Sequence, residues 1–70
     1  MKLHYYPETD SLYIDLSAKP SADSREVADG VVLDFDAEDN IVGIDIQHAS
    51  MKLDLKTVET RDLPVAEVKG

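Results

Sequence analysis

The densest group of potential metal ligands lies in one acidic stretch near the middle of the chain. Its spacing loosely resembles an EF-hand calcium loop, and the candidate ligands are Asp34, Asp36, Glu38 and Asp45. Calcium needs a ring of oxygens at close range, and the sharp turn of an EF-hand loop requires Gly at its sixth place. That place holds Asp39, and the flanking residues alternate as strands do. We therefore predict no metal site and no cofactor, with these four carboxylates as the candidates for any divalent cation.

Histidine, serine and aspartate show no arrangement that is typical of catalysis. His4 and His48 lack metal-ligand spacing, and no serine stands in a nucleophile-elbow sequence. Asp15, Asp34 and Asp45 are expected on an open, solvated face, as ordinary ionised aspartates without the burial that acid–base catalysis by paired carboxylates needs. We predict that the protein is not an enzyme and has no catalytic residues.

Three residues are candidates for an interaction surface. His4, Tyr6 and Tyr13 are expected to form an aromatic patch on the outward face of a hairpin. Such a patch is enriched at protein interfaces. Cross-strand aromatic pairs also stabilise hairpins without any partner, so both interpretations remain open.

The elements that would position these residues follow from period-2 alternation of apolar and polar side chains. Residues 7–10 and 37–40 have turn chemistry and divide the alternating runs into two β-hairpins. Residues 25–28 are expected to begin the third strand, with Asp29–Gly30 as a bulge inside it. We predict a four-stranded antiparallel sheet over residues 2–48.

The two hairpins resemble each other at an offset of 30 residues. Leu12-Tyr13-Ile14-Asp15-Leu16 corresponds to Val42-Gly43-Ile44-Asp45-Ile46. A single hairpin is too small to be stable in water, so two equivalent hairpins would form one sheet together. Duplication and convergence on a good hairpin sequence explain the similarity equally well.

The C-terminal third is expected to be a covering segment, residues 49–70, within a single domain of residues 1–70. Residues 49–53 favour a helical turn. Residues 55–60 fit either a short helix capped by Asp54 or a strand. The predicted fold is therefore mainly β, or α+β if this segment is helical, with a short C-terminal helix or irregular segment.

Charge and composition exclude several classes of partner. Seven basic residues stand against fifteen acidic ones, which gives a net charge of −8 and a pI near 4.4. Such a surface repels nucleic-acid phosphates and anionic lipid, so no nucleic-acid or membrane partner is expected. The same acidity also serves plain solubility. No apolar run is long enough for a bilayer, no signal peptide is recognisable, and there is no cysteine, so a cytoplasmic location is expected.

One face of the predicted sheet is apolar throughout and needs a cover. The short C-terminal segment is too weakly helical to supply that cover alone. We therefore expect a second copy of the chain, or a small basic protein, to complete the core. The predicted function is that of a small, acidic, non-catalytic protein-interaction module, and a small-molecule or divalent-metal binding protein is the alternative.

Three segments together resemble a small prokaryotic family known as domain of unknown function 2283. They are residues 6–16 (YPETDSLYIDL), residues 24–36 (SREVADGVVLDFD) and residues 41–46 (IVGIDI) followed by Ala49-Ser50. The resemblance covers residues 2–53. It lacks the family's Asp before Pro7 and has Asp45 in place of Glu. The family has no established activity, but some relatives are thought to be encoded beside small toxin-like proteins. The resemblance thus implies, as a further alternative, an antitoxin-like neutraliser of a small basic toxin.

Overall fold

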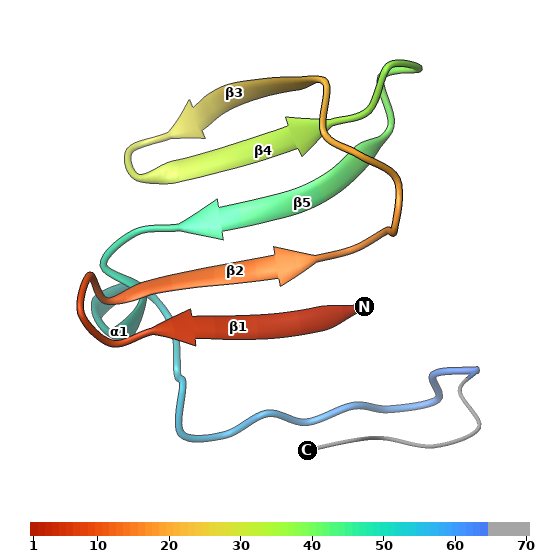
Figure 1. The fold of residues 1–70 in the computed structure, drawn as a ribbon. Coiled ribbons are helices and arrows are strands. Elements are labelled where there is room, and N and C mark those ends of the chain that lie inside the picture. The colour runs from red at the N-terminus through yellow and green to blue at the C-terminus, as the bar shows by residue number, and fades with distance from the viewer. Residues whose placement is uncertain (65–70) are drawn as a thin grey trace.

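The computed structural model describes residues 1–64, which form an open five-stranded antiparallel sheet and one short helix (Figure 1). The strands and the helix are β1 (Lys2–Tyr6), β2 (Ser11–Asp15), β3 (Asp23–Ala28), β4 (Val31–Phe35), β5 (Ile41–Ile46) and α1 (Ala49–Lys52). The order across the sheet is β1-β2-β5-β4-β3. The mainly β fold is therefore confirmed.

The prediction of four strands was wrong by one strand. Residues 23–28 form a separate strand, β3, which pairs antiparallel with β4 and ends with Ala28 opposite Val31. Asp29–Gly30 is the turn between them and not a bulge, because Gly30 adopts a left-handed φ of 71° that reverses the chain. The bulge lies at Val27, where the register shifts between Glu26 and Ala28.

The two predicted hairpins are present, and they meet at the centre of the sheet. The turn of residues 7–10 joins β1 to β2, and residues 36–40 join β4 to β5. The strands β2 and β5 then pair with Ile14 directly opposite Ile44. These two residues correspond at the 30-residue offset, so a pseudo-two-fold axis passes between them, perpendicular to the sheet.

Alternation along the strands separates an apolar face from a polar face. The apolar face carries Leu3, Tyr5, Leu12, Ile14, Val31, Leu33, Phe35, Val42, Ile44 and Ile46. The polar face carries His4, Tyr6, Ser11, Tyr13, Asp15, Ser24, Glu26, Asp34, Gly43 and Asp45. Most of the strand carboxylates thus lie on the other face of the sheet from the hydrophobic side chains.

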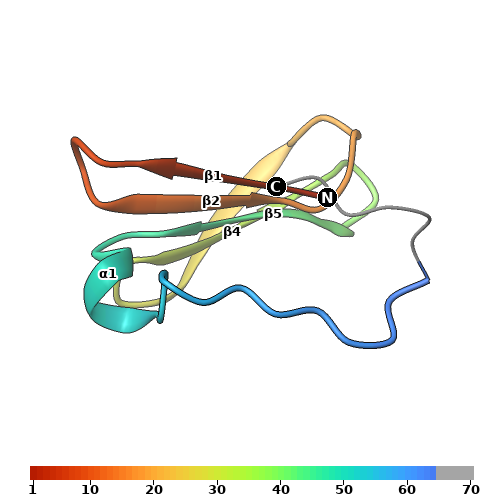
Figure 2. The same cartoon turned by 90° about the horizontal axis from the view of Figure 1, so that it is seen from below.

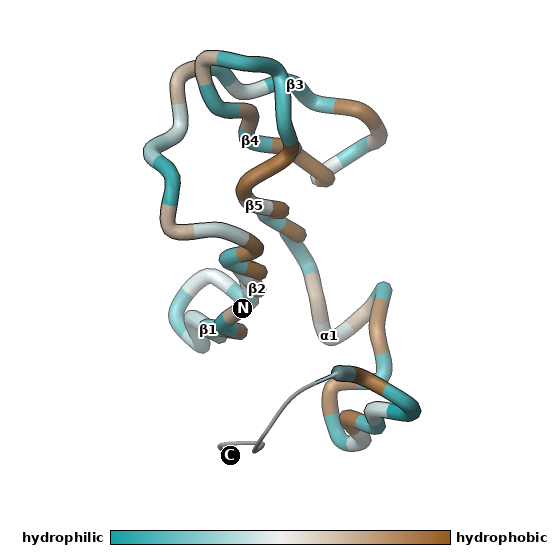
Figure 3. Tube along the Cα trace, turned by 90° about the vertical axis from the view of Figure 1, so that its right-hand side faces the viewer, coloured by the Kyte–Doolittle hydropathy of each residue, from teal (hydrophilic) through white to brown (hydrophobic). Residues whose placement is uncertain are grey.

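The helix α1 and the segment after it lie on one side of the sheet (Figures 2 and 3). That side is the apolar one, because Leu55 and Val58 line a cavity together with Leu3, Tyr5 and Leu12. The helical turn predicted near residue 49 is confirmed as α1. Residues 55–60 form neither the helix nor the strand that were considered. The last part of the expected covering segment, residues 65–70, lies outside the described residues.

The cover is thin. Among residues 1–64, the buried hydrophobic residues are Leu12, Val42 and Ala49. No helix in this part of the chain is long and apolar enough to cross a membrane.

Candidate functional site

The turn between β1 and β2 holds the start of α1 through Asp10. This residue has a left-handed φ of 52°, which Asp tolerates better than most residues. Its carbonyl oxygen accepts a hydrogen bond from the Ala49 N–H at 2.8 Å. Its carboxylate accepts bonds from the Ser50 N–H at 3.1 Å, the Ser50 hydroxyl at 2.7 Å and the Tyr5 hydroxyl at 2.7 Å. We call the side chains of Tyr5, Asp10 and Ser50 the Asp10 clamp.

The clamp favours the ionised form of Asp10. The Ser50 hydroxyl and then the Tyr5 hydroxyl lower the pKa of this carboxyl. The hydrogen bond from Tyr5 to Asp10 also raises the pKa of Tyr5, because the phenol must keep its proton to donate. Sequence reasoning missed the clamp, since no local pattern links residues that are 40 positions apart.

Beside the clamp lies a cavity of about 460 Å³, which we call the apolar groove. It is lined by Leu3, Tyr5, Leu12, Leu55 and Val58. The Tyr5 hydroxyl is the polar group of this lining, and it is already bonded to Asp10. The groove therefore offers hydrophobic contact and no charge to whatever enters it.

The polar face is organised around the Tyr13 hydroxyl. This hydroxyl donates to Asp34 Oδ2 at 2.8 Å, and the Ser24 hydroxyl donates to Asp34 Oδ1 at 2.6 Å. The bond to Asp34 raises the pKa of Tyr13 to about 12, with further contributions from partial burial and the nearby charges of Asp15 and Asp45. Removing the proton would create a phenolate among three carboxylates.

The Tyr13 ring lies over Gly43 on the neighbouring strand. A Cβ atom at position 43 would collide with the Tyr13 hydroxyl, would lie 2.6 Å from its Cζ and would lie 3.3 Å from Asp34 Oδ2. Contacting carbon atoms normally stand about 3.5–4.0 Å apart. The glycine therefore provides the space that the tyrosine ring fills.

The three predicted interaction residues share the polar face. His4 and Tyr6 are stacked, with their ring centroids 4.3 Å apart and an interplanar angle of 22°. Tyr13 stands opposite His4 on β2. Their role in binding a partner stays a prediction, and the hydroxyl of Tyr13 is engaged within the chain by Asp34.

The predicted metal candidates are not brought together. Asp34 accepts the two hydroxyl hydrogen bonds on the polar face, whereas Asp36 and Glu38 lie in the loop after β4 and Asp45 lies on β5. Within residues 1–64, no three His, Cys, Asp or Glu side chains form a group suited to a metal ion.

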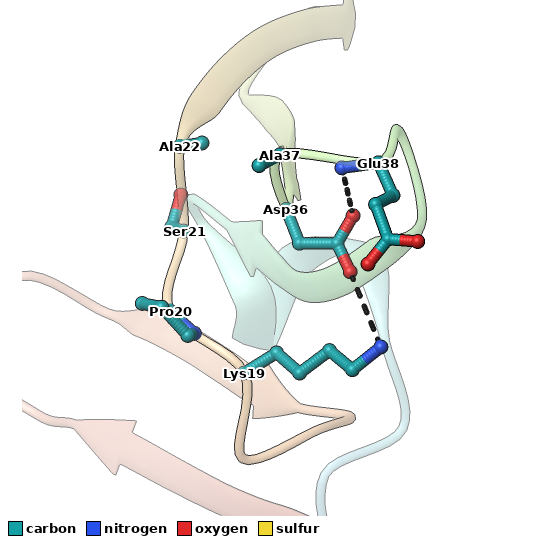
Figure 4. A pocket seen from close by; sticks show the side chains of 7 residues that line it. All are labelled: Lys19, Pro20, Ser21, Ala22, Asp36, Ala37 and Glu38. Atoms are coloured by element: carbon teal, nitrogen blue, oxygen red, sulfur yellow. Dashed lines mark hydrogen bonds and ion pairs between the residues drawn. The ribbon is translucent and has the colours of Figure 1, made fainter.

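The buried carboxylate of Asp36 stabilises the loop in which it lies, between β4 and β5. It accepts a hydrogen bond from the Glu38 N–H at 2.9 Å, and Lys19 Nζ lies 4.0 Å away (Figure 4). It also accepts a hydrogen bond from the Asn40 N–H at 2.9 Å. The Asn40 backbone is the main reason why the pKa of Asp36 is lowered. A shallow hollow of about 200 Å³ adjoins it, lined by Lys19, Pro20, Ser21, Ala22, Asp36, Ala37 and Glu38. Asp36 thus has a structural role in shaping the loop.

Comparison with known proteins relates this chain to a family model and to no individual protein. No curated protein and no solved structure matches the chain. A family model described as "Protein of unknown function (DUF2283)" matches residues 2–50, which is more than half of the chain. The matched range includes all five strands, Asp10 and its partner Ser50. The chain therefore belongs to the DUF2283 family, a family of unknown function.

Proposed function

We propose that this protein is a small, non-catalytic protein-interaction module that completes its hydrophobic core by associating with a second copy of itself. The observation that carries the proposal is the incompletely covered apolar face. Leu3 and Tyr5 are 51% and 41% exposed, although both stand in a sheet of mostly hydrophobic neighbours. A sheet face of this kind is stable when another layer or molecule buries it.

Charge distribution supports self-association in spite of the net charge of −8. Of the five strand carboxylates, Asp15, Asp34, Asp45 and Glu26 lie on the polar face. The fifth, Asp23, lies on the apolar face at the β3 edge and pairs with Arg25 at 3.4 Å. Two copies can therefore bring apolar surface together while the four carboxylates of the polar face point away. Like charges directly opposed across an interface would cost binding free energy, and this arrangement avoids that cost.

A non-catalytic role agrees with the polar groups of the molecule. The Tyr13 hydroxyl, the Ser24 hydroxyl and the Ser50 hydroxyl each donate to a carboxylate. A nucleophile needs a neighbouring base that accepts its proton and a free path to a substrate. These hydroxyl groups instead hold strands and α1 in place.

A second candidate is binding of a small basic protein, in the manner of an antitoxin. The observation that favours it is the cluster of Asp15, Asp34 and Asp45 around Tyr13 on one open face. A cationic partner would be steered to this face, and its association rate would fall with added salt. Rescue of growth when the protein is co-expressed with a small basic toxin encoded beside it would support this role. Absence of any complex between the two would contradict it.

Sedimentation equilibrium tests self-association directly, by giving the mass in solution at micromolar concentration. We expect a dimer, and we expect Leu3→Glu to shift it to monomer because the new charge would be buried at the apolar groove. Val27→Glu is the matched control, since Val27 is a 57% exposed aliphatic residue of β3 at the opposite edge. A stable wild-type monomer at micromolar concentration would show that self-association is wrong.

A further inference from the structure

The two edges of the sheet differ in how they are protected against pairing. The strand β3 forms one edge and carries the known protective devices, namely charged side chains and a bulge at Val27. Arg25 bonds Asp39 at 2.8 Å and lies 4.0 Å above the centre of the Phe35 ring. It thereby also covers the end of the apolar face next to β3.

The strand β1 forms the other edge and has almost none of these devices. It pairs with β2 over five residues without a register shift, and all five of its residues are exposed. Among the five strands, it alone contains no Asp or Glu. Its outer side is free of strand partners within residues 1–64, because β1 is terminal in the sheet order. Lys2, at the start of the strand, is its one formally charged residue. An exposed, regular edge without acidic residues favours pairing with another strand.

We infer that two copies of this chain associate by antiparallel pairing of their β1 strands, which joins the two five-stranded sheets into one continuous sheet. This inference rests on the self-association proposed above and names its surface. The lack of acidic residues on β1 makes a second copy a suitable occupant. Two strongly acidic molecules can approach through this edge without opposing carboxylates on the pairing strands.

The two-fold symmetry of such a dimer limits which residues of the two β1 strands can stand opposite each other. In a two-fold antiparallel pair, one residue stands opposite its own copy at the axis. Centring on His4 pairs Lys2 with Tyr6, Leu3 with Tyr5 and His4 with itself, so that all five residues of β1 take part. Centring on Leu3 or on Tyr5 would pair only three residues of the strand with each other. The longest ladder of backbone hydrogen bonds therefore has His4 at the axis.

The same register continues both faces of the sheet. Leu3 of one copy stands opposite Tyr5 of the other, so the two apolar grooves become one continuous apolar surface. On the polar face, the stacked His4 and Tyr6 rings of one copy adjoin His4 and Lys2 of the other. Leu3 of each copy gains Tyr5 of the other as a cross-strand neighbour, which buries part of the surface that both residues expose in the isolated chain. The rest of the apolar face is extended by this pairing and is not covered by it.

Cysteine scanning with a short bis-maleimide cross-linker tests this arrangement, because the chain has no cysteine of its own. In His4→Cys, the two sulfur-bearing residues would be direct cross-strand neighbours, with Cβ atoms about 5 Å apart. Tyr6→Cys is the control on the same strand and face, since its two copies would be offset by roughly 13 Å along the strands. Val27→Cys is the control at the opposite edge. Circular dichroism establishes that each variant has the wild-type fold.

We expect most of His4→Cys to become a covalent dimer, with roughly tenfold less product from the two controls. A mixture of Lys2→Cys and Tyr6→Cys chains should also cross-link, because these positions face each other in the same register; this mixture decides the question if His4→Cys does not fold. A wild-type dimer in which neither His4→Cys nor the mixture reacts would overturn the β1 interface while leaving self-association intact. Cross-linking at Val27 would place the interface at β3 and overturn the inference likewise. A monomeric wild type would overturn both proposals.

Discussion

Replacing Gly43 with alanine should destabilise the fold through the Tyr13 ring. The added Cβ would stand 2.6 Å from Tyr13 Cζ, about 1 Å inside normal contact, so the ring must leave its position. Its hydroxyl then loses Asp34, a hydrogen bond to a charged group worth about 1.5–3 kcal/mol when partly buried. Alanine is about 0.5–1 kcal/mol better than glycine within a strand, which offsets part of the loss. We expect a net loss of about 1–2 kcal/mol in the free energy of unfolding.

The sign of the effect should reverse when the ring is absent. In a Tyr13→Ala background the collision with the ring is gone and the remaining near neighbour is Asp34 Oδ2 at 3.3 Å, on a side chain that no longer bonds Tyr13, so Gly43→Ala should stabilise by about 0.5–1 kcal/mol. The double-mutant cycle therefore predicts a coupling free energy of about 1.5–3 kcal/mol between the two positions. In a Tyr13→Phe background the alanine should remain unfavourable, because Cζ is still present.

Urea unfolding of the four proteins at one protein concentration measures this coupling. For a domain of this size, a loss of 1 kcal/mol also lowers Tm by roughly 4–8 °C, which thermal unfolding can check. If Gly43→Ala costs the same with and without the Tyr13 ring, to within about 0.5 kcal/mol, the close approach does not explain the glycine. A stabilising effect of Gly43→Ala in the wild-type background would contradict the reasoning most directly.

Three further outcomes are expected. Absorbance titration should show a tyrosine that ionises near pH 12, and this transition should be absent in Tyr13→Phe. Because the folded-state pKa of Tyr13 is raised, the stability from this group is present below about pH 10 and is lost as the pH rises to about 12. Ser50→Ala should raise the pKa of Asp10 in a carboxyl NMR titration, whereas Ser11→Ala, whose hydroxyl contacts a backbone carbonyl, should leave it unchanged. Asp36→Asn should make the protein lose less stability on acidification below about pH 4. The reason is that a carboxyl with a lowered folded-state pKa contributes stability that is lost as the pH falls through that pKa. An unchanged acid transition would show that Asp36 does not contribute.

Local patterns predicted the parts of the fold that local physics determines. Alternation of apolar and polar residues located β1, β2, β4 and β5, and the turn residues located both hairpin loops. The strand β3 was missed because its alternation is broken by the bulge at Val27, so Asp29–Gly30 was interpreted as an irregularity in one long strand. The antiparallel pairing of Ala28 with Val31 and the left-handed Gly30 decide that point, and neither is visible in composition.

The candidate site was predictable only in part, because its contacts join distant segments. Alternation correctly placed His4, Tyr6 and Tyr13 on one face. Nothing local indicated that Tyr13 would bond Asp34 or that Ser50 would bond Asp10. Such pairs depend on strand order, which brings β2 beside β5 and carries α1 back to the first turn.

The pseudo-two-fold axis between Ile14 and Ile44 bears on the likeness of the two hairpins. Tyr13 and Gly43 are equivalent positions beside this axis, and they occupy one shared volume. Two tyrosines there would exclude each other, so a symmetric pair of hairpins cannot keep the ring in both halves. If the chain arose by duplication, the halves had to diverge at this position, with tyrosine in one half and glycine in the other. The difference between the halves is then a requirement of their symmetry.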